Sequence, residues 1–195
     1  PSLQDSLRIH FIDPPRAIAG VDQDFCSNEA VQLNGAISGV SAIGIWSTMG
    51  TGAFDPSPNF LITNYIPSAL DISNGSVTLI LTTSSVFGCA PDVDMITITF
   101  KPAPEGDFTA PIVCEGDNTV FTDQSITTSG SIVTWDWDFG DGITSLAQNP
   151  LHPYNGSGTY NAQLIVGGSN GCYDTIAYPV TVNPVPIADF GPVIA

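Results

Sequence analysis

Basic side chains are scarce in this sequence of 195 residues. Three lysines and arginines stand against 19 aspartates and glutamates, so the formal net charge is −16. The phosphate backbone of a nucleic acid would be repelled by this charge, and an anionic membrane surface is disfavoured for the same reason. No apolar run approaches the roughly 20 residues that a membrane-spanning helix needs. We therefore expect no nucleic-acid partner and no membrane insertion of this segment.

Groups for acid–base chemistry are also few. Only 11% of the residues are charged, against about 25% in ordinary soluble domains, and there are two histidines. Residues 167–171 read Gly-Gly-Ser-Asn-Gly, which matches the Gly-x-Ser-x-Gly motif of serine hydrolases. That motif requires a helix after the serine, whereas Cys172 and a strand-like run follow here. We expect no enzymatic activity from this segment.

Glycine and proline are plentiful, with 19 and 16 residues spread along the chain. They mark turns every 8–12 residues between short runs in which apolar and polar residues alternate. Such alternation is typical of half-buried strands, and no long segment has the 3.6-residue period of a helix. One helical turn near residues 68–72 is compatible with the pattern. The sequence therefore predicts an all-β protein.

Proline-containing junctions divide the chain into repeats. They begin at Pro14, Pro102 and Pro184, with spacings of 88 and 82 residues (from 14 to 102 and from 102 to 184). These lengths are typical of an immunoglobulin-like sandwich, and proline stops a strand and stiffens a short linker. We expect tandem immunoglobulin-like β-sandwiches within a longer protein. The predicted divisions are the last strand of a preceding module (1–13), two modules (14–102 and 103–184), and the start of the next (185–195).

The four cysteines follow the same repeat. Cys26 and Cys114 come early in their modules, whereas Cys89 and Cys172 come just before the last strand, in Gly-Cys-x-x-Asp and Gly-Cys-x-Asp. Four cysteines permit three pairings, and the repeat favours Cys26–Cys89 and Cys114–Cys172. Each such bond would stabilise its module by about 4 kcal/mol and would imply an oxidising compartment. A four-cysteine zinc site is the alternative, but its clustered Cys-x-x-Cys spacing is absent.

Residues 133–142 carry the clearest strand pattern. Val133, Trp135, Trp137 and Phe139 alternate with polar residues, which predicts a strand with its aromatic face toward a core. Asp141-Gly142 then predicts a tight turn and a strand that folds back. In the other module, Trp46 stands 20 positions after Cys26, as Trp135 stands 21 after Cys114. We therefore expect Trp46 and Trp135 to fill the same place in their cores.

The aspartates of this stretch form the strongest polar cluster. Asp136 and Asp138 share one face of the predicted strand, about 7 Å apart, and Asp141 follows in the turn. Calcium accepts oxygen ligands in flexible geometries, so these three residues are a candidate metal site. They do not form an EF-hand loop, because no glutamate stands at its twelfth position. The alternative is that Asp138 and Asp141 accept backbone N–H groups in the turn.

The same stretch, Trp-Asp-Phe-Gly-Asp-Gly at 137–142, resembles the signature of the PKD (polycystic kidney disease) domain, an immunoglobulin-like sandwich. Residues 149–154 resemble its Pro-x-His-x-Tyr element, and 158–164 its Gly-Thr-Tyr strand. The resemblance implies structural roles around the core tryptophan for Phe139, Gly140, Gly142, His152, Tyr154, Gly158 and Tyr160. In some secreted collagenases this domain binds calcium through an aspartate-rich loop before the tryptophan strand. The corresponding residues 126–131 carry no carboxylate.

The cysteines, the proline junctions and the acidity together resemble repeats of large surface proteins of Bacteroidetes, including gliding-motility adhesins exported by type IX secretion. The resemblance implies a non-catalytic stalk or adhesin segment at the bacterial cell surface. Its partners would be neighbouring repeats, with an extracellular polysaccharide or surface ligand bound by other parts of the protein. The alternative is a calcium- or carbohydrate-binding accessory module of a secreted hydrolase. A glycan site would need a row of exposed aromatics drawn from Tyr65, Tyr154, Tyr160, Tyr173 and Tyr178.

Overall fold

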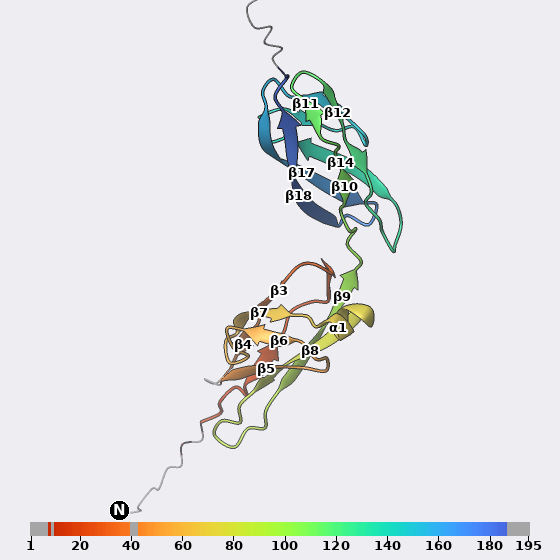
Figure 1. Ribbon diagram of the computed structural model, residues 1–195. Coiled ribbons are helices and arrows are strands. Elements are labelled where there is room, and N and C mark those ends of the chain that lie inside the picture. Colours follow the sequence, from red (N-terminus) through yellow and green to blue (C-terminus); the bar gives the residue numbers. More distant parts are fainter. Residues whose placement is uncertain (1–7, 9, 40–42, 187–195) are drawn as a thin grey trace, which may run out of the picture. The chain divides into compact units, whose positions relative to one another are not determined.

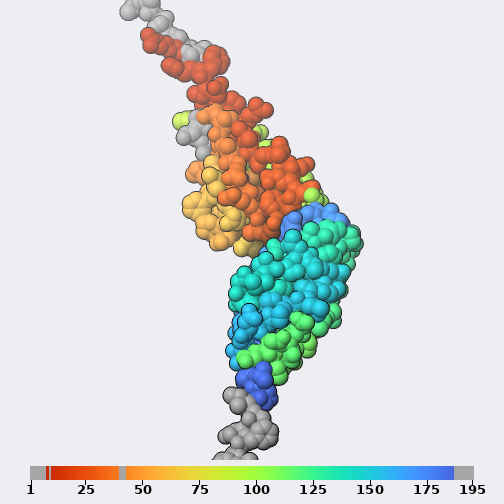
Figure 2. All heavy atoms as spheres, turned by 90° about the horizontal axis from the view of Figure 1, so that it is seen from above, coloured from red at the N-terminus to blue at the C-terminus, as the bar shows by residue number. Residues whose placement is uncertain are grey.

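The computed structural model describes residues 8, 10–39 and 43–186 (Figure 1). The chain divides into two compact units, Pro1–Lys101 and Pro102–Ala195, which we call module one and module two. This division falls one residue before the boundary expected from the proline junctions. Figure 2 shows the same chain as spheres, with module one in red to yellow-green and module two in green to blue.

The described residues of module one form nine strands and one short helix, α1 (Ala69–Ser73). Four strands form one sheet in the order β2-β9-β8-β5, three form a second in the order β3-β7-β6, and β1 pairs with β4. The strands are β1 (Arg16–Ile18), β2 (Gln23–Cys26), β3 (Val31–Asn34), β4 (Ala36–Ser38), β5 (Gly44–Thr48), β6 (Ala53–Asp55), β7 (Ile62–Ile66), β8 (Ser76–Thr83) and β9 (Val93–Lys101).

Over residues 102–186, module two repeats this plan with nine strands. Its main sheet has the order β11-β18-β17-β14-β15, and two strand pairs, β10-β13 and β12-β16, make up the rest. The strands are β10 (Phe108–Thr109), β11 (Val113–Cys114), β12 (Asn118–Val120), β13 (Thr122–Asp123), β14 (Ile132–Asp138), β15 (Thr144–Ser145), β16 (Leu151–Pro153), β17 (Gly158–Gly168) and β18 (Tyr173–Asn183).

Each module encloses its own apolar core, formed by the inward residues of alternating strands. In module one, every second residue of β8 is buried, and the apolar ones pack with Trp46 and Tyr65. They are Val77, Leu79 and Leu81. In module two the cluster of buried residues is Phe108, Phe121, Trp137, Phe139, Tyr154, Ala162, Leu164, Val166, Val180 and Val182. The predicted fold class, all-β with tandem immunoglobulin-like sandwiches, is confirmed.

The first strands of each module pair in the same way. In module one β1 pairs with β4, and after Gly20, whose φ is +107°, the chain enters β2, which runs parallel to β9. In module two β10 pairs with β13, and β11 runs parallel to β18. The second and the last strand of each module therefore lie side by side and point the same way.

Two of the segments expected from the sequence lie at the ends of the chain. The last strand of a preceding module, expected within residues 1–13, is not formed at residues 8 and 10–13, and residues 1–7 and 9 lie outside the described residues. A strand needs a neighbour for its backbone hydrogen bonds, and no pairing is recorded for these positions. Most of the expected start of a further module, 187–195, also lies outside the described residues.

Candidate functional site

The strand that carries the tryptophan motif is β14, and it is irregular at its start. A register shift between Ile132 and Thr134 against β17 leaves Val133 exposed rather than inward. Beyond the shift the alternation is regular: Trp137 is fully buried and Phe139 nearly so, whereas Trp135 is only half-buried. The hairpin predicted at Asp141-Gly142 is present, because β15 folds back on β14.

Trp46 of module one corresponds to Trp137, not to Trp135 as the cysteine spacing predicted. Trp46 is opposite Leu81 and Trp137 is opposite Leu164, and both indoles are buried. Both indole N–H groups donate to a main-chain carbonyl, of Leu61 at 3.1 Å and of Ala147 at 2.9 Å. Trp135 instead donates to the carboxylate of Asp123 at 2.7 Å. The tryptophan stands 20 positions after Cys26 in module one and 23 after Cys114 in module two. The equivalent tryptophan therefore lies two residues beyond Trp135, one period of strand alternation.

The three aspartates of the motif have separate local roles. Asp138 Oδ1 accepts the backbone N–H of Gly140 at 2.9 Å, and Asp141 Oδ1 accepts that of Ile143 at 3.1 Å. Asp136 lies on the exposed face of β14. Two of the three candidate ligands therefore fix the turn, which is the alternative that the sequence left open.

Asp141 also holds His152. Its Oδ2 atom lies 2.8 Å from His152 Nε2, and the histidine side chain is only 7% exposed. The imidazole stacks on Phe139 with ring centroids 4.1 Å apart and meets the edge of Tyr154 at 4.6 Å. Tyr154 in turn donates its hydroxyl to the Phe139 carbonyl at 2.9 Å, and burial raises its pKa. His152 is therefore a structural element of the core.

Tyr160 and Gly158 support the same corner of module two. Tyr160 stacks on Tyr154 with centroids 4.1 Å apart and donates its hydroxyl to the Gly156 carbonyl at 2.8 Å. Gly158 has a φ of +155° at the start of β17, where a side chain would be strained. These contacts hold the chain between β16 and β17 against the core.

The calcium-binding loop implied by the family resemblance is not reproduced at residues 126–131. The Thr127 hydroxyl donates to the Ser129 carbonyl at 3.0 Å, and the Ser131 N–H donates to the Ser169 hydroxyl at 3.2 Å. With no carboxylate in this loop, its donor set does not fit a calcium ion. Throughout the part of the chain that the structure describes, no three His, Cys, Asp or Glu side chains form a group that could hold a metal.

We expect calcium to leave the stability of module two unchanged. Millimolar calcium should shift its melting temperature by less than about 1 °C relative to chelator, whereas a site saturated 100-fold above its Kd would add about 2.7 kcal/mol. Scanning calorimetry measures the shift. A rise of several degrees that Asp136→Asn or Asp141→Asn abolishes would contradict this expectation and would establish a site at the turn.

The cysteines do not form the predicted pairs. Cys89 and Cys114 are free thiols, and Cys26 and Cys172 are disulfide-bonded. The strand register explains why Cys26–Cys89 cannot form. Cys26 lies opposite Lys101, at the end of β9, whereas Cys89 precedes the start of that strand. The nine residues of β9 span about 26 Å, and a disulfide needs Cα atoms within about 7 Å.

The same geometry excludes Cys114–Cys172. Cys114 lies opposite Asn183, the last residue of β18, and Cys172 directly precedes Tyr173, its first residue. The 11 residues of β18 place these two cysteines about 33 Å apart along the strand. Each module thus carries one cysteine at each end of its last strand.

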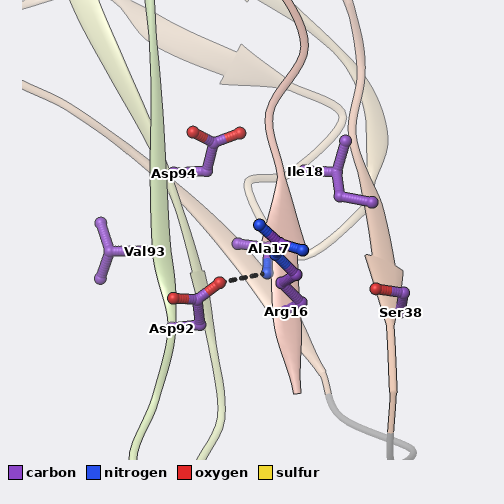
Figure 3. A pocket seen from close by; sticks show the side chains of 7 residues that line it. All are labelled: Arg16, Ala17, Ile18, Ser38, Asp92, Val93 and Asp94. Carbon is purple, nitrogen blue, oxygen red and sulfur yellow. Dashed lines mark hydrogen bonds between the residues drawn. The ribbon is translucent and has the colours of Figure 1, made fainter. Parts of the chain in front are cut away.

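The aspartate of the Gly-Cys-x-x-Asp and Gly-Cys-x-Asp elements has a role that the sequence did not reveal. In module one, Asp92 accepts the N–H of Ala17 at 2.9 Å (Figure 3). Asp94 accepts the N–H of Ala19 at 2.7 Å. In module two, Asp174 accepts the N–H of Gly106 at 2.8 Å. In both modules a carboxylate beside the last strand therefore holds the first segment of the chain. We call this contact the carboxylate clamp, and in each module it borders a pocket. The pocket in module one is lined by residues that include Arg16, Ser38 and Asp94. The pocket in module two is lined by residues that include Glu105, Asp107 and Tyr178.

A further carboxylate whose role sequence reasoning missed is that of Asp71 in α1, which is buried. It accepts hydrogen bonds from the Tyr65 hydroxyl at 2.8 Å, the Ser68 N–H at 3.0 Å and the Thr51 N–H at 2.9 Å. Burial acts to raise the pKa of Asp71, but these hydrogen bonds outweigh it and leave the pKa below its usual value. The Ser-x-x-Asp spacing of a helix cap at 68–71 was the signal that could have revealed it.

The tyrosines do not form a row on the surface. Tyr65 and Tyr154 are fully buried and Tyr160 is half-buried. Tyr173 and Tyr178 are exposed, but five positions separate them on β18, so they lie on opposite faces of the sheet. Tyr178 packs against Phe108 with centroids 5.1 Å apart. These five residues therefore do not provide the aromatic platform that a glycan site would need.

Comparisons with known proteins show what module two is similar to. Residues 101–182 match the PKD domain. A microbial collagenase of Vibrio alginolyticus is 36% identical over 69 residues, which are 35% of this chain and 8% of the relative. Collagenase ColA of Bacillus cereus is 37% identical over 65 residues, 33% of this chain and 7% of the relative. The chain thus spans less than a tenth of the length of these relatives.

Among solved structures, the PKD1 domain of the Vibrio cholerae metalloprotease PrtV is 32% identical, with a TM-score of 0.39 over 42% of this chain and 98% of that one. The PKD1 domain of Vibrio anguillarum Epp is 26% identical, with a TM-score of 0.40 over 43% of this chain and 96% of that one. No helix in the described part of the chain is long and apolar enough to cross a membrane.

Proposed function

We propose that the two modules form a non-catalytic accessory segment of a larger extracellular hydrolase and act as a spacer within it. The observation that carries the proposal is the match of residues 101–182 to the PKD domain. The similarity to collagenases supports the class of the larger protein, since the matching stretches are short parts of long enzymes. The disulfide-bonded state of the cysteines at positions 26 and 172 supports an oxidising, extracellular location.

The polar groups of the motif support a spacer more than a binding module. Asp138, Asp141 and His152 are engaged with backbone groups or with each other, and they hold the turn and the core. A binding site usually combines a concave pocket with a few convergent polar groups. Asp138, Asp141 and His152 instead stabilise the fold of module two.

A stalk or adhesin segment of the gliding-motility type is the second candidate. Module one favours it, because it repeats the sandwich, the buried tryptophan and the carboxylate clamp without the Trp-Asp-Phe-Gly-Asp-Gly motif. A plan shared by successive modules of different sequence is typical of a repetitive stalk. The relatives reported above are collagenases and metalloproteases, and for that reason the spacer of a hydrolase is our first proposal.

Two assays on the purified chain separate these functions. We expect no hydrolysis of fluorescent gelatin and no retention on insoluble collagen or on cellulose or chitin, with heat-unfolded protein as the control. Hydrolysis would refute the non-catalytic role. Retention on collagen would replace the spacer by a substrate-binding module, and retention on a polysaccharide alone would favour the adhesin.

A further inference from the structure

The chain contains four asparagine–glycine pairs, at positions 34–35, 74–75, 155–156 and 170–171. Asparagine is a thermolabile residue, and it loses its side-chain amide when the backbone nitrogen of the next residue attacks its Cγ atom. Glycine favours this attack, because it has no Cβ atom to obstruct the approach and its backbone is permissive. In an unfolded chain the four pairs should react at similar rates. Differences between them in the folded protein therefore depend on the structure.

Three of the four glycines donate their N–H to a backbone carbonyl. The pairs of donor and acceptor are Gly35 to Leu61 at 2.9 Å, Gly75 to Ile72 at 3.0 Å and Gly171 to Gly168 at 3.0 Å. The side chain of Asn170 is held as well, because its Oδ1 atom accepts the Cys172 N–H at 3.1 Å. A hydrogen-bonded nitrogen can attack only after the surrounding backbone opens, so the reaction is slowed by the small population of the open state. These three pairs are therefore protected.

The pair Asn155-Gly156 differs from the other three. It lies in the connection between β16 and β17, and Asn155 is exposed. Among the hydrogen bonds of the residues that the structure describes, none involves the Gly156 N–H or the Asn155 side chain. The attacking nitrogen and the carbon that it attacks are therefore both free. We infer that Asn155 is a site of spontaneous deamidation in the folded protein, and that it reacts before the other three asparagines.

The reaction consumes one water molecule and releases one ammonia, and it needs no oxidant or reductant. The Gly156 nitrogen loses its proton to base and bonds to Asn155 Cγ. The bond from Cγ to the amide nitrogen breaks, and this nitrogen takes up a proton and leaves as ammonia. Water then opens the resulting succinimide ring at one of its two carbonyl carbons. Opening at Cγ gives aspartate, whereas opening at the main-chain carbonyl gives isoaspartate, in which the main chain runs through Cγ.

The two products should affect module two differently. The Gly156 carbonyl accepts the Tyr160 hydroxyl at 2.8 Å, and Tyr160 stacks on the buried Tyr154 with centroids 4.1 Å apart. Isoaspartate at position 155 adds one methylene group to the main chain directly before Gly156, which moves this carbonyl away from Tyr160. Aspartate adds a negative charge but leaves the main chain unchanged. Isoaspartate therefore weakens this corner of module two, in a spacer and in a stalk alike.

Peptide mapping by mass spectrometry tests the selectivity. After incubation of the full chain in a warm, mildly alkaline buffer, Asn155 should be converted at least about tenfold more than each of the other three asparagines. The same incubation in urea is the control, because unfolding removes the protecting hydrogen bonds and the four conversions should become similar. Equal conversion of all four in the folded chain would overturn the inference. So would an Asn155 that stays intact in the folded chain but reacts in urea.

Two variants test the mechanism and its consequence. Gly156→Ala should stay folded in a calorimetric melt, because the φ of Gly156 is not positive and a Cβ atom there would lie 3.5 Å from the Tyr160 hydroxyl oxygen, an ordinary contact. The added methyl group obstructs the attack, so Asn155 should react several-fold more slowly, and an unchanged rate would contradict the mechanism.

Asn155→Asp reproduces the aspartate product and should melt with the unmodified chain. The isoaspartate form, separated from incubated protein by chromatography, should melt about 5 °C lower in module two, as expected for the loss of one hydrogen bond in a domain of this size. An isoaspartate form as stable as Asn155→Asp would refute the predicted effect on the corner at Tyr160.

Discussion

Replacing Gly140 by alanine should lower the free energy of unfolding of module two by about 3 kcal/mol, the sum of backbone strain and overpacking. Gly140 has a φ of +82°, which side chains with a Cβ atom rarely adopt. A Cβ atom there would also lie 2.7 Å from the Asn161 carbonyl oxygen and 2.9 Å from its nitrogen. These are main-chain atoms of β17, so they cannot move without disturbing the sheet.

Gly142→Ala is the matched control for this change. Gly142 has a similar φ of +90°, but a Cβ atom there meets nothing within 4 Å. Gly142→Ala should therefore lower the free energy of unfolding only through backbone strain, by about 1 kcal/mol. In calorimetry the two variants should lower the melting transition of module two by about 15 °C and about 5 °C. Equal shifts would show that the contact with Asn161 contributes nothing.

Replacing Asp71 by alanine should have the largest effect in module one, a loss of about 3 kcal/mol. The change removes the acceptor for Tyr65, Ser68 and Thr51, and the buried Tyr65 hydroxyl loses its carboxylate partner. Asp24→Asn is the control, because the exposed Asp24–Lys101 ion pair at 3.1 Å should contribute less than about 1 kcal/mol.

The stability that Asp71 confers should depend on pH. The hydrogen bonds place its folded-state pKa below the unfolded value of 3.8. The contribution is therefore complete above pH 3.8 and is lost as the pH falls through the lower, folded-state pKa. Asp71→Asn should be less stable at neutral pH and should lose less stability on acidification. Hydrogen-exchange mass spectrometry between pH 3 and 7 can follow module one separately, and an unchanged acid dependence would contradict this assignment.

Much of the fold could be predicted because it depends on local patterns. Strand alternation, glycines in turns and the spacing of the proline junctions all act over a few residues or over one module length. Even so, the predicted inward position of Val133 was wrong, because a register shift at this point turns its side chain outward. The spacing argument also paired Trp46 with Trp135, because counting from a cysteine ignores how many residues the intervening loop contains.

The cysteine pairing could not be predicted, because it depends on strand direction rather than spacing. Cys26 and Cys114 each end a strand that runs parallel to the last strand of its module, which carries them away from Cys89 and Cys172. The roles of Asp92 and Asp174 could not be predicted either, because their hydrogen-bond partners lie 75 and 68 positions earlier in the chain. Such contacts become visible only when both sheets are assembled.

The parallel pairing of the second and last strands of each module has a mechanical consequence. A pull on the two ends of a module would draw β2 toward its start and β9 toward its end, so the strands would slide past each other. The hydrogen bonds between them would then be loaded together, in shear, rather than opened one after another. The β11–β18 pair gives module two the same geometry. Both modules are therefore built to resist extension under tension, whichever larger protein carries them.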